Sequence, residues 1–218
     1  MRLLASLVVL LSLSVLGSAQ TGRSPEELAR ALQERYQSVR DFTADFVQTY
    51  RGGVLRTETR ERGTVAVKKP GRMRWIYTSP ERKEFVSDGM KMYAYIPEDK
   101  QVTVSNVPTD SEAPTPVLFL AGKGDLVKDF TATRAESPVP GSVAIKLTPR
   151  RTEPEYEYLI VAVDPASLQI RALTTRDRQG GESTLRFENL KENQGISDND
   201  FAFRIPRGVD VISNGQRN

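Results

Sequence analysis

The 218-residue sequence contains neither cysteine nor histidine, and these two absences exclude several classes of protein. Without cysteine there is no disulfide framework, so apolar burial has to stabilise the fold. Without histidine, Ser/His/Asp and Cys/His catalysis are ruled out, and the commonest general base and metal ligand is missing. No spacing of carboxylates marks out a catalytic pair. We therefore expect a protein that is not an enzyme and that holds no metal or cofactor.

An excess of charge of one sign is also lacking, because 31 Lys and Arg residues face 28 Asp and Glu residues. A nucleic-acid-binding surface requires a concentrated basic face, whereas here basic and acidic residues are interleaved. We interpret most of these charges as solvated surface and expect no nucleic-acid partner.

Long apolar runs are absent except at the N-terminus. Met1-Arg2 precedes an apolar stretch from Leu3 to Leu16, and the small residues 17–19 follow it. This order is typical of a secretory signal peptide cleaved after Ala19. The run is shorter than the roughly 20 residues of a transmembrane helix, although an uncleaved anchor is the competing interpretation. We expect residues 1–19 to be the signal peptide and residues 20–218 to form a single exported, soluble domain without an acyl anchor.

One amphipathic helix is predicted near the start of the exported part, ending near Arg40. Ser24 is suited to the N-cap, Pro25 to the first helical position, and Glu27 completes a capping box. Apolar residues follow at helical spacing, and they are Leu28, Leu32, Tyr36 and Val39.

After this helix the apolar period changes from 3.6 to 2, which indicates strands. About ten strands follow, joined by turn signals such as Asp88-Gly89, a strong hairpin signal. A short apolar helix is predicted within residues 115–122, and residues 201–208 resemble a closing strand. The predicted fold is mainly β, with a strongly curved antiparallel sheet or open barrel and helices laid on one side.

Several segments together resemble one known family. The first three are Val67-Lys68-Lys69-Pro70-Gly71-Arg72-Met73-Arg74-Trp75, then Val86-Ser87-Asp88-Gly89, then Tyr95 with Pro97. Residues 42–48 follow the first helix, residues 115–120 precede the second half, and residues 201–209 contain Phe-x-Phe and Pro-x-Gly-Val. In this order they closely resemble the periplasmic outer-membrane lipoprotein carrier family (LolA), over essentially the whole exported chain.

The resemblance implies an incomplete, half-open antiparallel β-barrel covered by an α-helical lid. It also implies a monomeric carrier in the periplasm that binds lipoprotein acyl chains in an apolar cavity. Such a carrier takes lipoproteins from an inner-membrane ABC transporter and delivers them to an outer-membrane acceptor. Because each buried methylene contributes about 0.8 kcal/mol, a chain of ~16 carbons represents on the order of 12 kcal/mol, so free diffusion of the cargo is negligible.

Candidate cavity walls are apolar side chains at one phase of the strands or in the short apolar helix. Methionine adds adaptable surface to such a cavity. For any one of these residues, plain core packing is the competing interpretation. The candidates are Phe46, Met73, Trp75, Tyr77, Met90, Met92, Val117, Leu118 and Leu120.

Lys69 is the candidate latch of the lid. The resembling proteins often have an arginine before this proline, where it hydrogen-bonds the lid backbone and holds the empty state closed. Lysine offers a point charge rather than a planar fork, so we expect a lid that opens more readily. The competing interpretation is a solvated lysine at a strand end.

Arg72 and Arg74 are candidates for docking a partner. They lie opposite the apolar phase of their strand, with Arg60 and Arg62 on the previous strand, and could meet an acidic patch on the transporter or acceptor. A solvated row is the alternative.

Two other binding proteins would share the implied architecture. A periplasmic lipid- or lipoprotein-binding sensor or regulator usually carries a further C-terminal domain, and we expect none here after Phe203. The outer-membrane acceptor needs a lipidated cysteine after its signal peptide, where this chain has Gln20.

Overall fold

The computed structural model describes residues 22–52, 57–107, 119–120, 122 and 124–213. The predicted signal peptide, Val117 and Leu118 lie outside these residues. Within the described part, none of the helices combines the length and apolar character needed to cross a membrane.

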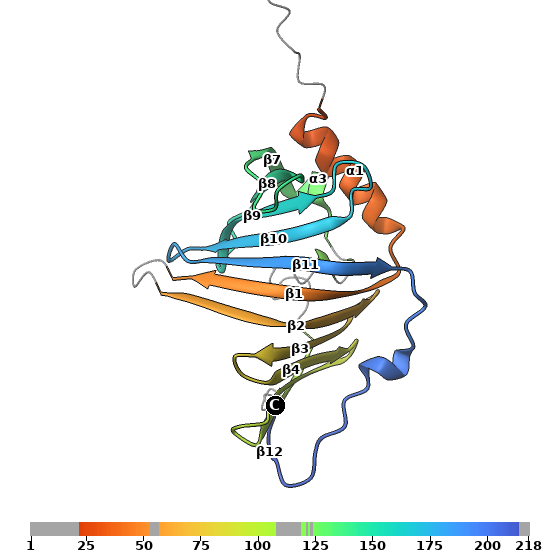
Figure 1. Ribbon diagram of the computed structural model, residues 1–218, viewed down its shortest axis with the longest axis vertical. Coiled ribbons are helices and arrows are strands. Elements are labelled where there is room, and N and C mark those ends of the chain that lie inside the picture. Colours follow the sequence, from red (N-terminus) through yellow and green to blue (C-terminus); the bar gives the residue numbers. More distant parts are fainter. Residues whose placement is uncertain (1–21, 53–56, 108–118, 121, 123, 214–218) are drawn as a thin grey trace, which may run out of the picture.

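One curled sheet dominates the described residues (Figure 1). Its twelve strands are arranged in the order β12-β6-β5-β4-β3-β2-β1-β11-β10-β9-β8-β7. Two α-helices, α1 (Pro25–Gln37) and α3 (Leu126–Asp129), and a 3-10 helix, η1 (Asp198–Phe201), accompany it. The strands are β1 (Asp41–Arg51), β2 (Glu58–Lys68), β3 (Arg72–Ser79), β4 (Lys83–Asp88), β5 (Lys91–Ile96), β6 (Gln101–Asn106), β7 (Phe130–Ala135), β8 (Val143–Pro149), β9 (Tyr156–Val163), β10 (Ile170–Asp177), β11 (Glu182–Glu192) and β12 (Asp210–Ser213).

The predicted fold, a mainly β half-barrel with helices on one side, is confirmed. All neighbouring strands pair antiparallel except at one edge, where β12 pairs in parallel with β6. The predicted closing strand at 201–208 is wrong, since η1 ends there and the strand begins only at Asp210. The segment between β11 and β12 runs past several strands before it reaches the far edge of the sheet, so it can pair there only after residue 208 (Figure 1).

The first helix follows directly from its sequence. The Glu27 amide donates to Ser24 Oγ over 3.2 Å, and the Ser24 amide donates to the Glu27 carboxylate over 2.7 Å. This capping box satisfies backbone donors that would otherwise lack partners at the helix start. The apolar stripe of α1 is buried against the sheet through Leu28, Leu32 and Tyr36.

The main core lies on the concave face of the sheet. Residues that alternate along the strands face inward, so that Phe42, Ala44 and Phe46 of β1 are buried together. The same alternation brings Val65 and Val67 of β2 to this face. The two halves of the concave face differ in what covers them. Helix α1 contacts β7 and β8 and so covers that half of the face.

Candidate functional site

A cavity of about 260 Å³ opens on the concave face where β1, β3, β4, β5 and β11 meet. Strand pairing places Trp75 opposite Phe85, Met73 opposite Ser87, and Ser87 opposite Met92, so these side chains share one face. The structure thereby brings together four of the predicted wall residues, Met73, Trp75, Tyr77 and Met92. The full lining is Gln48, Met73, Trp75, Tyr77, Phe85, Val86, Ser87, Met92 and Leu185.

Phe46 lies behind this wall and supports it. Its ring makes edge contacts with Trp75 at 5.2 Å and with Tyr77 at 4.9 Å between centroids, and the residue is only 1% exposed. Its strand partner is Gly63, where an added Cβ would lie 2.9 Å from the Phe46 ring and 2.0 Å from the Ile76 carbonyl oxygen. The absence of a side chain at Gly63 therefore makes room for the ring that backs the cavity.

Met90 does not line the cavity, which corrects the sequence prediction. It is 78% exposed and sits with Gly89 in the two-residue turn between β4 and β5. The Asp88 carboxylate accepts hydrogen bonds from the amides of Met90 and Lys91 over 2.8 and 2.7 Å. Because the strand begins one residue after Met90, its side chain never enters the inward phase that Met92 occupies.

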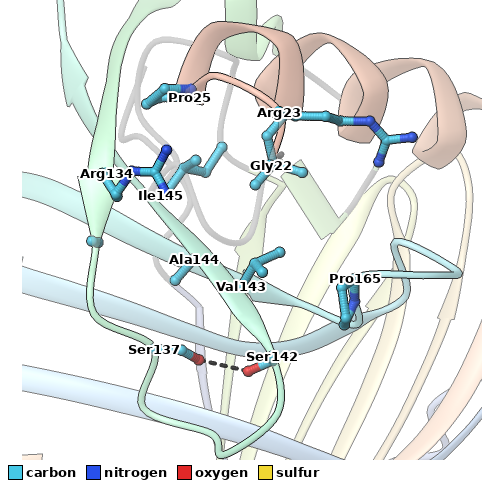
Figure 2. A pocket seen from close by; sticks show the side chains of 12 residues that line it. Gly22, Arg23, Pro25, Arg134, Ser137, Ser142, Val143, Ala144, Ile145 and Pro165 are labelled. Atoms are coloured by element: carbon cyan, nitrogen blue, oxygen red, sulfur yellow. Dashed lines mark hydrogen bonds between the residues drawn. The ribbon is translucent and has the colours of Figure 1, made fainter. Parts of the chain in front are cut away.

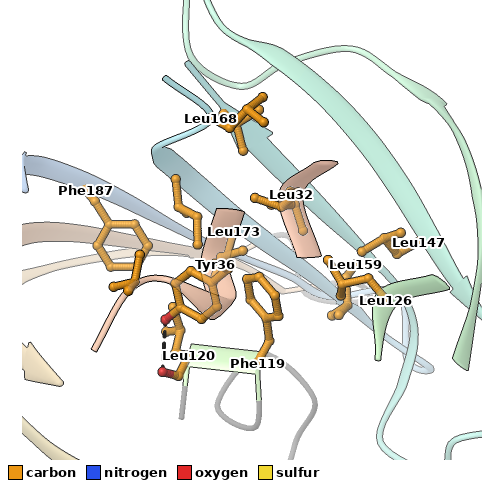
Figure 3. Packing of buried hydrophobic residues seen from close by; sticks show 14 of the residues in the cluster. Leu32, Tyr36, Phe119, Leu120, Leu126, Leu147, Leu159, Leu168, Leu173 and Phe187 are labelled. Atoms are coloured by element: carbon orange, nitrogen blue, oxygen red, sulfur yellow. Dashed lines mark hydrogen bonds between the residues drawn. The ribbon is translucent and has the colours of Figure 1, made fainter. Parts of the chain in front are cut away.

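Leu120 is buried beneath α1 and does not line the cavity of about 260 Å³. The Tyr36 hydroxyl donates to the Leu120 carbonyl over 2.9 Å, and the Tyr36 ring stacks on Phe119 at 4.5 Å (Figure 3). Burial raises the pKa of Tyr36, with the nearby Glu192 charge adding to the effect, so the hydroxyl remains a neutral donor. We call α1 together with Phe119 and Leu120 the lid.

Lys69, in the turn between β2 and β3, contacts the lid directly. Its ammonium donates to the Tyr36 carbonyl in the last turn of α1 and lies 3.7 Å from the centroid of the Tyr36 ring. Its stem passes Gly122, where an added Cβ would come within 2.4 Å of the Lys69 Cδ atom. Burial lowers the pKa of Lys69 to about 8. The negative charge of Glu192 opposes this shift, and the positive charge of Arg35 adds to it.

Arg72 and Arg74 lie on the opposite, convex face, where they contact this chain's own C-terminal segment. Arg74 donates to the Ala202 carbonyl over 3.0 Å and pairs with Glu84 at 3.1 Å. Arg72 approaches Asp198 at 3.5 Å. The contacts with Ala202 and Asp198 join positions more than 100 residues apart, so no local pattern in the sequence indicates them.

Sequence reasoning also missed part of the wall and part of the lid. Phe85 and Leu185 line the cavity, and the alternation of their strands was a signal that could have identified them. The sequence pattern indicates Tyr36 only as one residue of an amphipathic stripe, and nothing in it indicates that its hydroxyl has a partner 84 residues away.

A second, larger hollow of about 640 Å³ lies beside the start of α1 (Figure 2). Leu28, Val143 and Ile145 contribute apolar surface to it, and Ser137 and Ser142 lie together at its edge, with their hydroxyl oxygens 2.6 Å apart. None of the predicted site residues lines it. Among the described residues there is no group of three or more acidic side chains that could hold a metal ion.

Comparison with known proteins identifies relatives over most of the chain. The family model described as "Outer membrane lipoprotein carrier protein LolA" matches residues 37–204. An outer-membrane lipoprotein carrier protein from Chromohalobacter salexigens is 32% identical over 207 residues, which cover 94% of this chain and 93% of the relative. The protein of the same name from Hahella chejuensis is 32% identical over 186 residues, covering 84% and 86%.

A solved structure of an uncharacterized conserved protein from Thermus thermophilus is similar in fold. The TM-score is 0.53 at 14% sequence identity, and the match covers 85% of this chain and 98% of that chain. At this identity the likeness concerns the fold alone.

Proposed function

This chain belongs to the outer membrane lipoprotein carrier protein LolA family, and from that membership we propose that it carries lipoproteins by enclosing their acyl chains. The observation that carries the proposal is the concave apolar face, which has an unfilled cavity next to a helical lid. Covering acyl chains needs apolar area, whereas releasing them needs loose packing, and a cavity under a movable lid provides both.

We also propose where this carrier works and which partners it meets. The carrier works in the periplasm as a monomer of one domain, after removal of residues 1–19, and catalyses no reaction. It receives lipoproteins from an inner-membrane ABC transporter and passes them to an outer-membrane acceptor. Arg72 and Arg74 could take part in these encounters only if the C-terminal segment releases them, since both now contact it. No observation favours the alternative of a sensor or regulator.

The lid has to move for cargo to enter. The cavity of about 260 Å³ is smaller than the roughly 300–1,000 Å³ of typical pockets for small ligands, and the cargo has long acyl chains. The adjoining part of the concave face is occupied by Tyr36, Phe119 and Leu120. Acyl chains would replace these side chains against the sheet, so that one apolar contact is exchanged for another at small net cost.

Lys69 acts in this proposal as the latch of the closed lid. Its ammonium connects the β2–β3 turn to the last turn of α1, and its stem lies against Gly122. Because burial disfavours the charged ammonium, the latch holds weakly, in line with a lid that opens readily.

The test is recovery of cargo from cells. The full-length protein is expressed with its own leader in a Gram-negative host, purified from the periplasm without detergent, and analysed by mass spectrometry. We expect acylated lipoproteins to co-purify, and the variant Trp75→Glu, which puts a charge on the cavity wall, to lose them. Arg178→Glu, at an exposed turn, is the matched control and should retain them. Recovery of the wild-type protein free of lipoprotein would contradict the proposal.

A further inference from the structure

The concave face changes from apolar to polar along an oblique line across five neighbouring strands, because the step is offset by two residues between β11 and β1 and between β2 and β3. On each strand the inward residue next to an apolar or glycine position is polar: Gln48 follows Phe46 on β1, and Tyr77 follows Trp75 on β3. The same step occurs from Gly63 to Glu61 on β2, from Phe85 to Lys83 on β4, and from Leu185 to Ser183 on β11. We call Gln48, Glu61, Tyr77, Lys83 and Ser183 the polar rim.

The members of the polar rim are connected to one another. The Tyr77 hydroxyl donates to Gln48 Oε1 over 2.8 Å, and the Gln48 amide donates to Ser183 Oγ over 3.0 Å. Lys83 pairs with Glu61 and lies 4.5 Å above the centroid of the Tyr77 ring. Burial raises the pKa of Tyr77 to about 12, with Glu61 contributing, so its hydroxyl stays protonated at neutral pH.

Among the described residues, the contacts of this network leave some donor hydrogens unused next to an apolar cavity, which Gln48 and Tyr77 line and which Lys83 adjoins through the Tyr77 ring. An ammonium has three hydrogens and a primary amide has two. The contacts described for Lys83 use one hydrogen for Glu61, and those for Gln48 use one for Ser183. Gln48 and Tyr77 line the cavity itself, beside the apolar Trp75 and Phe85. Lys83 and Glu61 are about three-quarters buried, so a hydrogen bond made there is only partly screened by water.

We propose that the polar rim is the subsite for the ester and amide carbonyls that join the acyl chains to the lipoprotein, with Lys83 as the principal donor. The inference rests on the proposed carrier function and adds an orientation to it. The apolar tails would lie along Met73, Trp75 and Phe85, and the carbonyls, which only accept hydrogen bonds, would meet the unused donors at the rim. The lipidated end of the cargo would then leave the cavity toward the end of β1 and the turn that joins β3 to β4.

The experiment compares two synthetic lipopeptides of equal tail length. One carries two palmitoyl esters on a glyceryl-cysteine, and the other carries two ethers, which lack the carbonyl oxygens. Trp75 is the only tryptophan of the chain and lines the cavity, so its fluorescence reports binding. We expect the wild-type protein to bind the ester roughly tenfold more tightly than the ether, as one charge-assisted hydrogen bond allows. Lys83→Met should bring the ratio close to one by weakening ester binding alone.

The control is Lys146→Met. Lys146 also lies over a tyrosine ring, at 4.0 Å from that of Tyr158, but on the convex face. It should keep the tenfold preference. Lys83→Met leaves the Glu61 carboxylate without its ion-pair partner. A double variant, Lys83→Met with Glu61→Gln, removes that charge and should show the same ester-to-ether affinity ratio as Lys83→Met.

Three results would count against the inference. Equal affinity of the wild-type protein for ester and ether would overturn the polar rim as a carbonyl subsite while leaving the carrier function standing. A preference retained in both Lys83 variants would overturn the role of Lys83. Binding of neither lipopeptide would overturn the inference together with the proposed function.

Discussion

At the scale of single residues, the cavity depends on where side chains are absent as well as on where they are present. The Phe46 ring, which backs Trp75 and Tyr77, occupies space that a side chain at Gly63 would need. The Cβ of any other residue at 63 would meet the Ile76 carbonyl, which belongs to the backbone of β3 and cannot turn aside. One glycine thereby sets the spacing of β2 and β3 behind the cavity wall.

Gly63→Ala should lower the free energy of unfolding by about 2–4 kcal/mol, because strands or ring must shift to relieve the contact. Urea denaturation followed through Trp75 fluorescence measures this difference. Gly22→Ala is the control, since an added Cβ there meets nothing within 4 Å, and it should change stability by less than about 0.5 kcal/mol. Equal stability of the two variants would show that the β2–β3 spacing is not fixed by Gly63.

A second residue-scale prediction concerns the pH dependence of the latch. Burial in the closed state holds the pKa of Lys69 near 8, against an ordinary value of 10.5 in water. The open state therefore binds more protons between these two values, so lid opening should decrease as pH rises from about 8 to about 10.5. Below pH 8 the ammonium is charged in both states, and opening should be independent of this group.

Binding of a long-chain fluorescent fatty acid at pH 7.5 and pH 10 measures this effect, because entry requires an open lid. The groups facing Lys69 are Glu192, Arg35 and the Tyr36 hydroxyl, and burial raises the pKa of Tyr36 so that it stays neutral throughout. Lys69→Met should abolish the Lys69-dependent part of the pH response. A pH response of the same size in this variant would assign it to other groups.

At the scale of elements, the C-terminal segment is a strap over the convex face. Phe201 is fully buried, and Phe203 stacks on Tyr93 at 5.1 Å between ring centroids. Arg74 holds the backbone between these two phenylalanines through the Ala202 carbonyl. The strap then ends as β12, which adds a parallel strand at the β6 edge. One segment thus covers the outside of the sheet and protects one of its edges from unwanted pairing.

Phe201→Ala should cost about 3–5 kcal/mol of stability, as expected when a fully buried aromatic side chain is removed. Hydrogen exchange of β6 should rise in this variant, because β12 is anchored through the same segment. Arg204→Ala, at an exposed position of the strap, serves as the comparison and should leave both measurements nearly unchanged. Unchanged protection of β6 in Phe201→Ala would show that β12 is held independently of Phe201.

At the scale of the whole molecule, the lid and the sheet compete for the same apolar face. In the described structure, Tyr36, Phe119 and Leu120 occupy part of the concave surface, and the cavity of about 260 Å³ remains open beside them. Guest size therefore decides whether the lid must move. A short chain can occupy the existing space, whereas a long one must displace the lid.

We expect an octyl-chain lipid to bind without changing hydrogen exchange in α1, and a palmitoyl-chain lipid to increase it. The amides of residues 32–36 are the reporters, since this part of the helix packs on the core. Exchange in β9, where Val161 is buried in the same core, is the internal control and should stay constant. Increased exchange in α1 with both chain lengths would mean that the existing cavity admits neither chain while the lid is closed.

Much of this architecture could be read from the chain alone. The helix cap at Ser24, the change of period after Arg40 and the inward phase of Met73, Trp75 and Tyr77 are local patterns, and each appears where predicted. The segments around Lys69 and Asp88, which occur in the same order as in the family, also identified that family correctly. The prediction for Met90 was wrong because the strand begins one residue later than the pattern indicates. The contacts of Arg72 and Arg74 with the C-terminal segment were not foreseen, and their role in docking stays a prediction.

The sequence by itself determined the mainly β character, the apolar face and the absence of histidine and cysteine chemistry, because these follow from composition and from periods of a few residues. Only the tertiary structure decided that Tyr36 bonds Leu120, that Lys69 contacts the lid, and that β12 runs parallel to β6. These contacts join residues from 33 to more than 100 positions apart. Patterns of a few residues cannot indicate contacts between positions so far apart in the sequence. These contacts form only when the curled sheet brings its strands and helices together.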